Sequence, residues 1–215
     1  MTQTTTIIGI TGASGAGKSR FAQQLYARVG RQFATGSVSI LNEDCYYRDR
    51  SDLTFEQRCD INYDHPDAME HDLLASHLAM LRAGKRVQIP QYDHSIHNRI
   101  PATSTLEPSR ILIVEGILIL HHLHLRDLLD LKLFVDVPMD ICLSRRLRRD
   151  IQERGRSLDS VLSQYEQTVR PMYFEYIDPC KQHADLIVPQ GGENENALRV
   201  LENHLSSLLA RESGR

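Results

Sequence analysis

The sequence predicts an α/β protein in which helices sandwich a mainly parallel β-sheet. Short apolar runs, of the kind found in strands buried on both faces, recur along the chain. Segments with apolar residues at helical spacing separate these runs. Because this alternation is typical of crossover units around a parallel sheet, we expect ligands to bind beyond the carboxyl ends of the strands.

Five segments are expected to form strands, and five are expected to form helices. The expected strands are residues 4–11, 37–42, 110–116, 131–137 and 184–189. The expected helices are residues 19–30, 71–84, 139–155, 157–170 and 195–210. The segment from about 85 to 102 alternates in polarity and contains proline, which predicts a β-hairpin excursion at the edge of the sheet. We expect residues 1–215 to form a single domain.

Composition excludes several classes of protein. The chain has 215 residues, of which 41% are hydrophobic and 25% are charged, as in a globular protein with one buried core. Its formal net charge of −3 argues against a general nucleic-acid binder. The four cysteines show no metal-ligand spacing, the N-terminus lacks an export signal, and the apolar run 111–120 is too short to span a bilayer. We therefore expect a cytoplasmic protein without a membrane or nucleic-acid partner.

A glycine-rich loop lies between the first predicted strand and the first predicted helix. It matches the pattern G-x-x-x-x-G-K-[ST], in which backbone N–H groups surround phosphate, the lysine reaches the β/γ oxygens and the hydroxyl faces Mg²⁺. The predicted nucleotide-binding residues are Gly12, Ala13, Ser14, Gly15, Ala16, Gly17, Lys18 and Ser19. The loop predicts a P-loop NTPase fold, but it does not identify the group that receives the phosphate.

A carboxylate at the end of a later apolar strand is expected to hold Mg²⁺ together with Ser19. Glu115 ends one such run, and Gly116 behind it lets the chain turn. Asp136 ends another run and is the rival candidate. We favour Glu115, and the alternative is that either group is a strand-end carboxylate that faces water.

The segment NEDCYYRD, at the end of the second predicted strand, supplies a candidate catalytic base. A kinase has to hold the acceptor hydroxyl in line, accept its proton with a carboxylate and place cations on the transferring group. Asp44 is placed for the carboxylate role. The alternative is a solvated loop acid.

Two further segments carry candidate nucleoside-binding residues. In NYDHPDAM, Asp64 can accept hydrogen bonds from two vicinal ribose hydroxyls and Tyr63 can stack on a base, although this stretch alone is better explained as a loop leading into a helix. In PQYDHSIHNR, Tyr92, His94 and His97 lie together, and a neutral imidazole can donate and accept at one edge of a pyrimidine. Surface histidines are common, so none of the ten is informative by itself.

Six arginines gather around the end of the third predicted helix. They are Arg145, Arg146, Arg148, Arg149, Arg154 and Arg156. In an otherwise acidic chain, this cluster indicates a closing helical lid, at about residues 145–170, whose guanidinium groups neutralise transferring phosphate. The alternatives are a solvated helix face paired with Asp150 and Glu153, and an RNA contact.

Taken together, these segments resemble the uridine kinase (uridine-cytidine kinase) family, P-loop kinases related to phosphoribulokinase. The resemblance covers almost the whole chain, and its most specific parts are NYDHPDA and RRDIQERGRS…QYEQTVRPM. It implies transfer of the γ-phosphoryl group of ATP or GTP, with Mg²⁺, to the 5′-hydroxyl of uridine or cytidine, giving UMP or CMP in pyrimidine salvage.

The resemblance also implies roles for individual residues. By position, Asp44, Lys18 and Arg149 match the family's catalytic residues, and Arg154 matches a residue that contacts the phosphate donor. Ser19 and Glu115 match the metal-binding residues. The residues that match the nucleoside-binding positions are Tyr63, Asp64, Tyr92, His97, Arg146 and Gln164. Gln190 and His94 depart from the family's pattern, where arginine and an aromatic or apolar residue are usual. Family members are commonly homotetramers that respond to CTP or UTP, so the resemblance implies a homo-oligomer.

Three rival functions remain open at this point. A related P-loop kinase could act on another small metabolite, although NYDHPDA, Tyr92 and His97 weigh against it. A P-loop NTPase switch of the GTPase type would need a guanine-reading N-K-x-D, which the sequence lacks. An RNA-binding protein is disfavoured by the net charge and by the absence of aromatic residues among the arginines.

Overall fold

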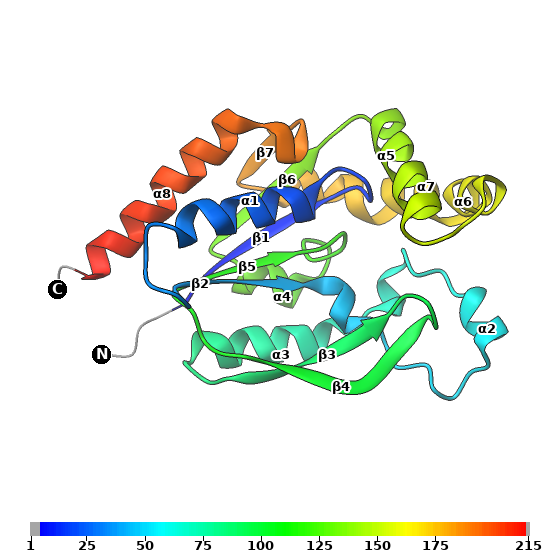
Figure 1. Ribbon diagram of the computed structural model, residues 1–215, viewed down its shortest axis with the longest axis horizontal. Helices are drawn as coiled ribbons and strands as arrows, with labels where there is room; N and C mark the ends of the chain where they lie inside the picture. Colours follow the sequence, from blue (N-terminus) through cyan, green and yellow to red (C-terminus); the bar gives the residue numbers. More distant parts are fainter. Residues whose placement is uncertain (1–4, 214–215) are drawn as a thin grey trace.

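Five parallel strands form the central sheet of the computed structural model, which describes residues 5–213 (Figure 1). In spatial order they are β2 (Val38–Asn42), β5 (Ile111–Glu115), β1 (Thr6–Gly12), β6 (Leu131–Asp136) and β7 (Leu186–Pro189). The predicted α/β fold class is confirmed, and all five expected strands form. The expected start of the first strand at Thr4 lies outside the described residues.

The register of the sheet aligns the ends of its central strands. Glu115, the last residue of β5, pairs with Asn42 at the end of β2 on one side and with Ile10 of β1 on the other. Every residue of β5 is buried, which is why this run is continuously apolar up to its final carboxylate. The carboxyl ends of β1, β2 and β5 therefore meet at one edge of the sheet.

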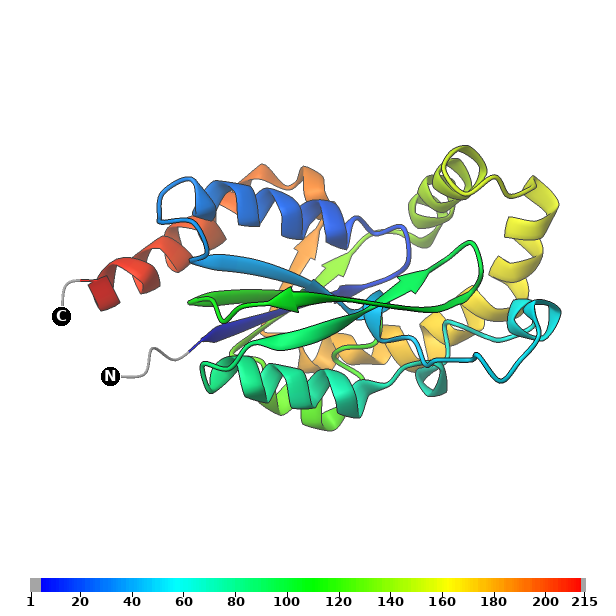
Figure 2. The ribbon, with the colours of Figure 1, turned by 60° about the horizontal axis from the view of Figure 1, so that its bottom comes forward.

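Helices cover both faces of the sheet. The helices α1 (Lys18–Gly30) and α8 (Glu195–Ser213) pack together on one side, and α3 (His71–Arg82) packs with α4 (Leu123–Leu128) on the other (Figure 2). Within residues 5–213, no helix combines the length and the apolar character that crossing a membrane requires.

The hairpin consists of β3 (Val87–Asp93) and β4 (Asn98–Leu106). The two strands pair only with each other, with a shift of register between Pro90 and Gln91. The hairpin forms as predicted and lies beside the edge strand β2, where Ile89 and Leu106 line one hollow with Ile40, but it does not extend the main sheet. Val87 and Ile89 pack into the core, while Pro90 has no N–H group to offer a neighbouring strand.

The second half of the chain is more helical than the sequence indicates. After α5 (Met139–Gln152), the chain turns at Gly155 and enters α6 (Leu158–Gln164). Helical turns then continue through α7 (Arg170–Met172) to His183. This continuation and the short helices α4 and α2 (Phe55–Cys59) are not among the elements expected from the sequence. Figure 1 shows α5, α6 and α7 standing beside the carboxyl edge of the sheet, where they face the turn of the hairpin.

Candidate active site

A cavity of about 610 Å³ lies at the carboxyl edge of the sheet. Of the predicted site residues, those that line it are Ser14, Gly15, Gly17, Lys18, Ser19, Asp44, Tyr63, Asp64, Tyr92, His97, Glu115, Arg146, Arg149, Arg154 and Gln164. The remaining three, Gly12, Ala13 and Ala16, belong to the loop but do not line the cavity. Residues far apart in the sequence thus meet around one volume large enough for small-molecule ligands.

The glycine loop uses backbone conformations that only glycine adopts easily. Gly15 and Gly17 have φ angles of 85° and 91°, which favour glycine because side chains rarely adopt them. A Cβ at Gly15 would also lie 2.3 Å from the carbonyl oxygen of Cys142. The Nζ of buried Lys18 donates to the carbonyl oxygen of Ala13 at 3.0 Å. Burial lowers the pKa of Lys18, and the nearby Glu115 and Asp44 oppose that shift.

The residues proposed for Mg²⁺ lie within hydrogen-bond distance of each other. The Ser19 hydroxyl donates to Oε1 of Glu115 at 2.8 Å. Burial raises the pKa of Glu115, which the Lys18 ammonium opposes. The rival, Asp136, pairs instead with Lys181 at 3.0 Å and does not line the cavity. A hydroxyl beside a carboxylate supplies the oxygen ligands that Mg²⁺ prefers, so these residues fit a magnesium site.

The Asn42 side chain fixes the backbone of Asp44 just after the end of β2. The side chain of Asn42 accepts a hydrogen bond of 2.8 Å from the Asp44 amide and so caps the short turn Glu43–Tyr46. The Oδ2 of Asp44 lies 3.8 Å from Nε2 of His94. Burial raises the pKa of Asp44, and His94 opposes the shift. The side chain lines the cavity and is 37% exposed.

Glu43 is a supporting residue that the sequence analysis missed. It is fully buried, accepts a hydrogen bond from His71 Nε2 at 2.8 Å and accepts another from the Leu118 amide at 2.9 Å. These contacts tie the start of the Asp44 turn to α3 and to the chain after β5. A buried carboxylate is stabilised only when it has such partners, and these lie far away in the sequence.

Replacing Gly116 by alanine should disturb this support. A Cβ at Gly116 would lie 2.1 Å from Oε2 of Glu43, whose buried position leaves it little room to move. We expect Gly116→Ala to cost about 1–3 kcal/mol, as overpacked interior sites do, and to lower kcat. Thermal unfolding should be compared with Gly30→Ala, where a Cβ meets nothing within 4 Å. Equal melting temperatures for the two variants would contradict the prediction.

The predicted nucleoside-binding side chains form a second wall of the cavity. The ring of Tyr63 stacks on His97, with centroids 5.4 Å apart and planes 20° from parallel. Tyr92 lies beside the same pair, and its ring centroid is 5.1 Å from that of His94. Burial lowers the pKa of His97, which favours the neutral imidazole, a group that can both donate and accept. This wall offers aromatic and polar contacts to a flat ligand.

Asp64 lies between this wall and the arginines. It is 93% buried, since only 7% of the residue is exposed, and burial raises the pKa of its carboxylate. The Arg146 guanidinium opposes that shift. Arg146 donates to the Ser14 hydroxyl of the glycine loop and to the Gln164 side chain, each at 2.8 Å. One guanidinium therefore connects the phosphate loop to the proposed ribose side.

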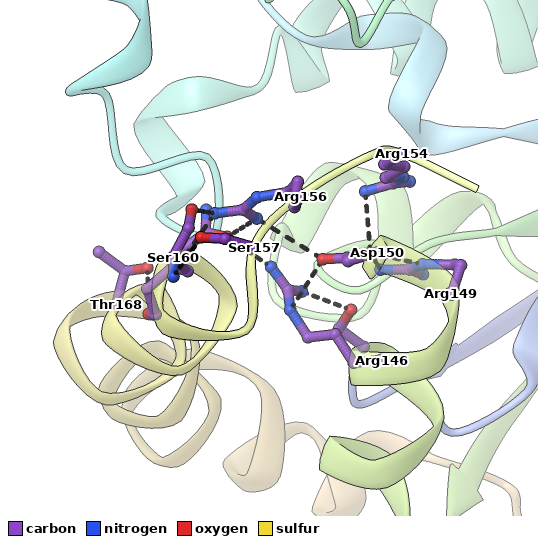
Figure 3. A network of polar contacts seen from close by, with 10 residues as sticks. Arg146, Arg149, Asp150, Arg154, Arg156, Ser157, Ser160 and Thr168 are labelled. Carbon is purple, nitrogen blue, oxygen red and sulfur yellow. Dashed lines mark hydrogen bonds and ion pairs between the residues drawn. The ribbon is translucent and has the colours of Figure 1, made fainter. Parts of the chain in front are cut away.

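Asp150 is the centre of the arginine cluster (Figure 3). Its fully buried carboxylate lies 2.9 Å from Arg149 and 3.5 Å from both Arg146 and Arg156. Arg154 is 3.7 Å away. These four arginines and Arg145 line the cavity, whereas Arg148 is exposed outside it. More positive than negative charge thus surrounds Asp150, which favours the anion-binding interpretation of the cluster over a solvated helix face.

The two departures from the family pattern differ in their surroundings. His94 lines the cavity beside Asp44, so it can influence the reaction directly. Gln190 is exposed, has a φ of 68° and does not line the cavity. The next residue, Gly191, lies against the loop, because a Cβ there would be 2.2 Å from the Ala16 carbonyl oxygen.

The parallel sheet, the glycine loop after β1 and the adjoining wall of acceptor-side residues define a P-loop kinase. A family model described as "Phosphoribulokinase / Uridine kinase family" matches residues 7–197. The chain belongs to this family.

Curated relatives match the chain over nearly its full length. A uridine kinase of Proteus mirabilis (strain HI4320) is 51% identical over 197 residues, 92% of each chain. A uridine kinase of Shewanella amazonensis is 50% identical over 205 residues, 95% of this chain and 97% of the relative.

Solved structures share the fold at low identity. A candidate fructose transport system kinase from Silicibacter sp. TM1040 has a TM-score of 0.69 and 21% identity, covering 86% of this chain and 90% of its own. A candidate uridine kinase from Bacillus stearothermophilus has a TM-score of 0.58 and 19% identity, covering 87% and 90%. At these identities the likeness supports the fold alone.

Proposed function

We propose that this enzyme transfers the γ-phosphoryl group of ATP or GTP to the 5′-hydroxyl of uridine or cytidine. The observation that carries the proposal is the single cavity, in which the phosphate loop and Asp44 adjoin Asp64, Tyr92 and His97. A nucleotide switch would have no use for these acceptor-side residues. The curated relatives named uridine kinase, at about half identity over most of the chain, support the same activity.

In this proposal the nucleoside lies between Asp64 and the aromatic wall. The carboxylate of Asp64 accepts hydrogen bonds from the vicinal ribose hydroxyls, while Arg146 and Gln164 fix its surroundings. The pyrimidine lies near Tyr92 and His97. The stacked pair Tyr63 and His97 holds the base-facing wall of the cavity in place, since the Tyr63 hydroxyl also donates to the His97 carbonyl oxygen at 3.2 Å.

Asp44 then accepts the proton of the 5′-hydroxyl as that oxygen attacks the γ-phosphorus. The bond from the γ-phosphorus to the oxygen that bridges it to the β-phosphate breaks, and ADP or GDP leaves. Lys18, Arg149 and Arg154 place positive charge around the transferring group, where it stabilises the charge of the transition state. Ser19 and Glu115 would hold Mg²⁺, which when bound neutralises charge on the β- and γ-phosphate oxygens. We place a movable lid at about residues 145–170, in which closure would bring the arginines over the phosphates and exclude water.

ADP release from Mg²⁺–ATP tests the proposal when it is measured with uridine, cytidine, adenosine, pantothenate or no acceptor. We expect stimulation by the two pyrimidine nucleosides only, with UMP or CMP as the phosphorylated product. Equal release without an acceptor would indicate an NTPase, and stimulation by pantothenate alone would indicate a different metabolite kinase. Replacing ATP by GTP in the same assay measures donor preference. Light scattering tests the proposed homo-oligomer, a tetramer by family resemblance.

The pH dependence of the reaction should reflect the protonation of Asp44 and of its neighbour His94. Because burial raises the pKa of Asp44, the acid limb of kcat/KM should lie above the value of an ordinary aspartate. A protonated His94 is a positive neighbour that lowers the pKa of Asp44. His94→Phe removes that charge, so the acid limb should move to higher pH. An unmoved or lowered limb would contradict this, and His204→Ala, an exposed histidine of α8, is the control.

A further inference from the structure

Three potential metal ligands lie close together where α3 meets α4, outside the kinase cavity. Asp72 belongs to the first turn of α3, while His122 and His124 flank the start of α4. One ligand atom from each of the three residues lies within 4.8 Å of the other two. The Nε2 of His122 is 3.7 Å from Oδ1 of Asp72, and the rings of His122 and His124 have centroids 5.4 Å apart.

These side chains are available for a ligand. In the described part of the chain, the ring nitrogens of His122 and His124 make no hydrogen bond, and the contact with His122 is the one polar contact of the Asp72 carboxylate. Asp72 and His124 are exposed, whereas His122 is half-buried. Residues on two different elements thus converge, with Nε2 of His122 facing the Asp72 carboxylate and Nδ1 of His122 buried without a hydrogen-bond partner.

The three side chains together suit a metal ion of intermediate softness, such as Zn²⁺. Imidazole nitrogen together with carboxylate oxygen suits Zn²⁺ and similar ions, whereas Mg²⁺ and Ca²⁺ prefer oxygen alone. With metal–ligand bonds of about 2.0–2.1 Å, two ligand atoms on a tetrahedral zinc ion stand about 3.4 Å apart. The 3.7 Å between His122 and Asp72 is near this spacing. The exposed side chains of Asp72 and His124 can close the remaining distance by rotating.

We propose that Asp72, His122 and His124 bind one Zn²⁺ or a similar ion, with water in the fourth position. The site is separate from the Mg²⁺ residues, since none of the three lines the kinase cavity. They line a second hollow of about 330 Å³ that also includes His71.

A bound ion at this site would join α3 to α4 close to His71, the residue whose contact with Glu43 supports the Asp44 turn. The ring of His122 lies 5.1 Å from that of His71, centroid to centroid, and His71 holds the buried Glu43. Since the ion binds the folded arrangement, it should raise the melting temperature, and the rise should grow as the free ion concentration exceeds its dissociation constant. This expectation is independent of the substrate of the kinase.

Calorimetric titration of the full chain, without an affinity tag, with ZnCl₂ in excess Mg²⁺ tests the proposal. We expect one Zn²⁺ per chain, a higher melting temperature, and a visible spectrum of tetrahedral type when Co²⁺ is used. His124→Ala and Asp72→Asn each change an exposed side chain, so both should fold. Each should weaken binding at least about tenfold, the smallest loss expected even from removing an outer partner of a metal ligand.

His204→Ala, which removes an exposed histidine of α8, is the matched control and should bind Zn²⁺ as the unchanged chain does. The proposal is overturned if the unchanged chain binds no Zn²⁺. It is also overturned if His124→Ala and Asp72→Asn bind as tightly as the control.

Discussion

Asp44→Asn should abolish phosphoryl transfer and leave nucleotide binding largely intact. The amide has nearly the same shape as the carboxylate, but it cannot accept the proton of the acceptor hydroxyl. Loss of a positioned general base costs about 10²–10⁴ in rate. The cap from Asn42 acts on the Asp44 backbone, so the turn should survive the substitution. The side chain is also partly exposed, so a severe loss of stability is not expected.

The measurement is kcat with a saturating pyrimidine nucleoside, together with the affinity for ATP by calorimetry. Asp49→Asn is the matched control, because Asp49 is an exposed carboxylate nearby that does not line the cavity. The assigned role fails if the Asp44 variant keeps its activity. It also fails if a folded variant loses ATP binding together with activity.

Asp150→Asn should both destabilise the enzyme and weaken nucleoside binding. The carboxylate is fully buried and its closest buried partner is Arg146, which is 7% exposed. Removing one member of a buried ion pair costs about 3–5 kcal/mol, because it leaves the other charge without compensation. Arg149, Arg154 and Arg156 are about a third exposed, so solvent screens their share and the lower figure is appropriate.

A loss of about 3 kcal/mol should lower the melting temperature by about 6–12 °C in a chain of this length. The KM for the nucleoside should rise, because Arg146 would no longer be held beside Gln164 and Asp64. Glu153→Gln is the matched control, since Glu153 ends the same helix but is exposed. An Asp150 variant that melts and binds like this control would refute the central role of the carboxylate.

The parts of the fold that the sequence predicts well are those controlled by local pattern. The strand Ile111–Glu115 is buried throughout, so its apolar run is sufficient evidence. The helix α2 carries a local signal in the sequence, a capping box between Thr54 and Gln57, although it is not among the expected helices. The helix α4 has only six residues and no clear periodicity, so pattern alone cannot define it.

The site was predictable where a residue belongs to a motif and unpredictable where it depends on a distant partner. The glycine loop and its Ser19 could be identified directly, and the preference for Glu115 over Asp136 agrees with the contact to Ser19. The role of Glu43 depends on His71, which lies 28 positions away. Among adjacent charged residues, the sequence also does not show that Asp150 alone is fully enclosed.

The pairing of β5 with β2 sets the distance between the two halves of the site. Because Glu115 stands level with Asn42, one set of backbone hydrogen bonds fixes both the carboxylate beside Ser19 and the residue that caps the Asp44 turn. A slip of one position would send the Glu115 side chain to the opposite face. The strand register thus sets the spacing between the phosphate-donor side of the site, at Ser19 and Glu115, and the acceptor side, at Asp44. An insertion within β5 would change this spacing even if each side kept its own structure.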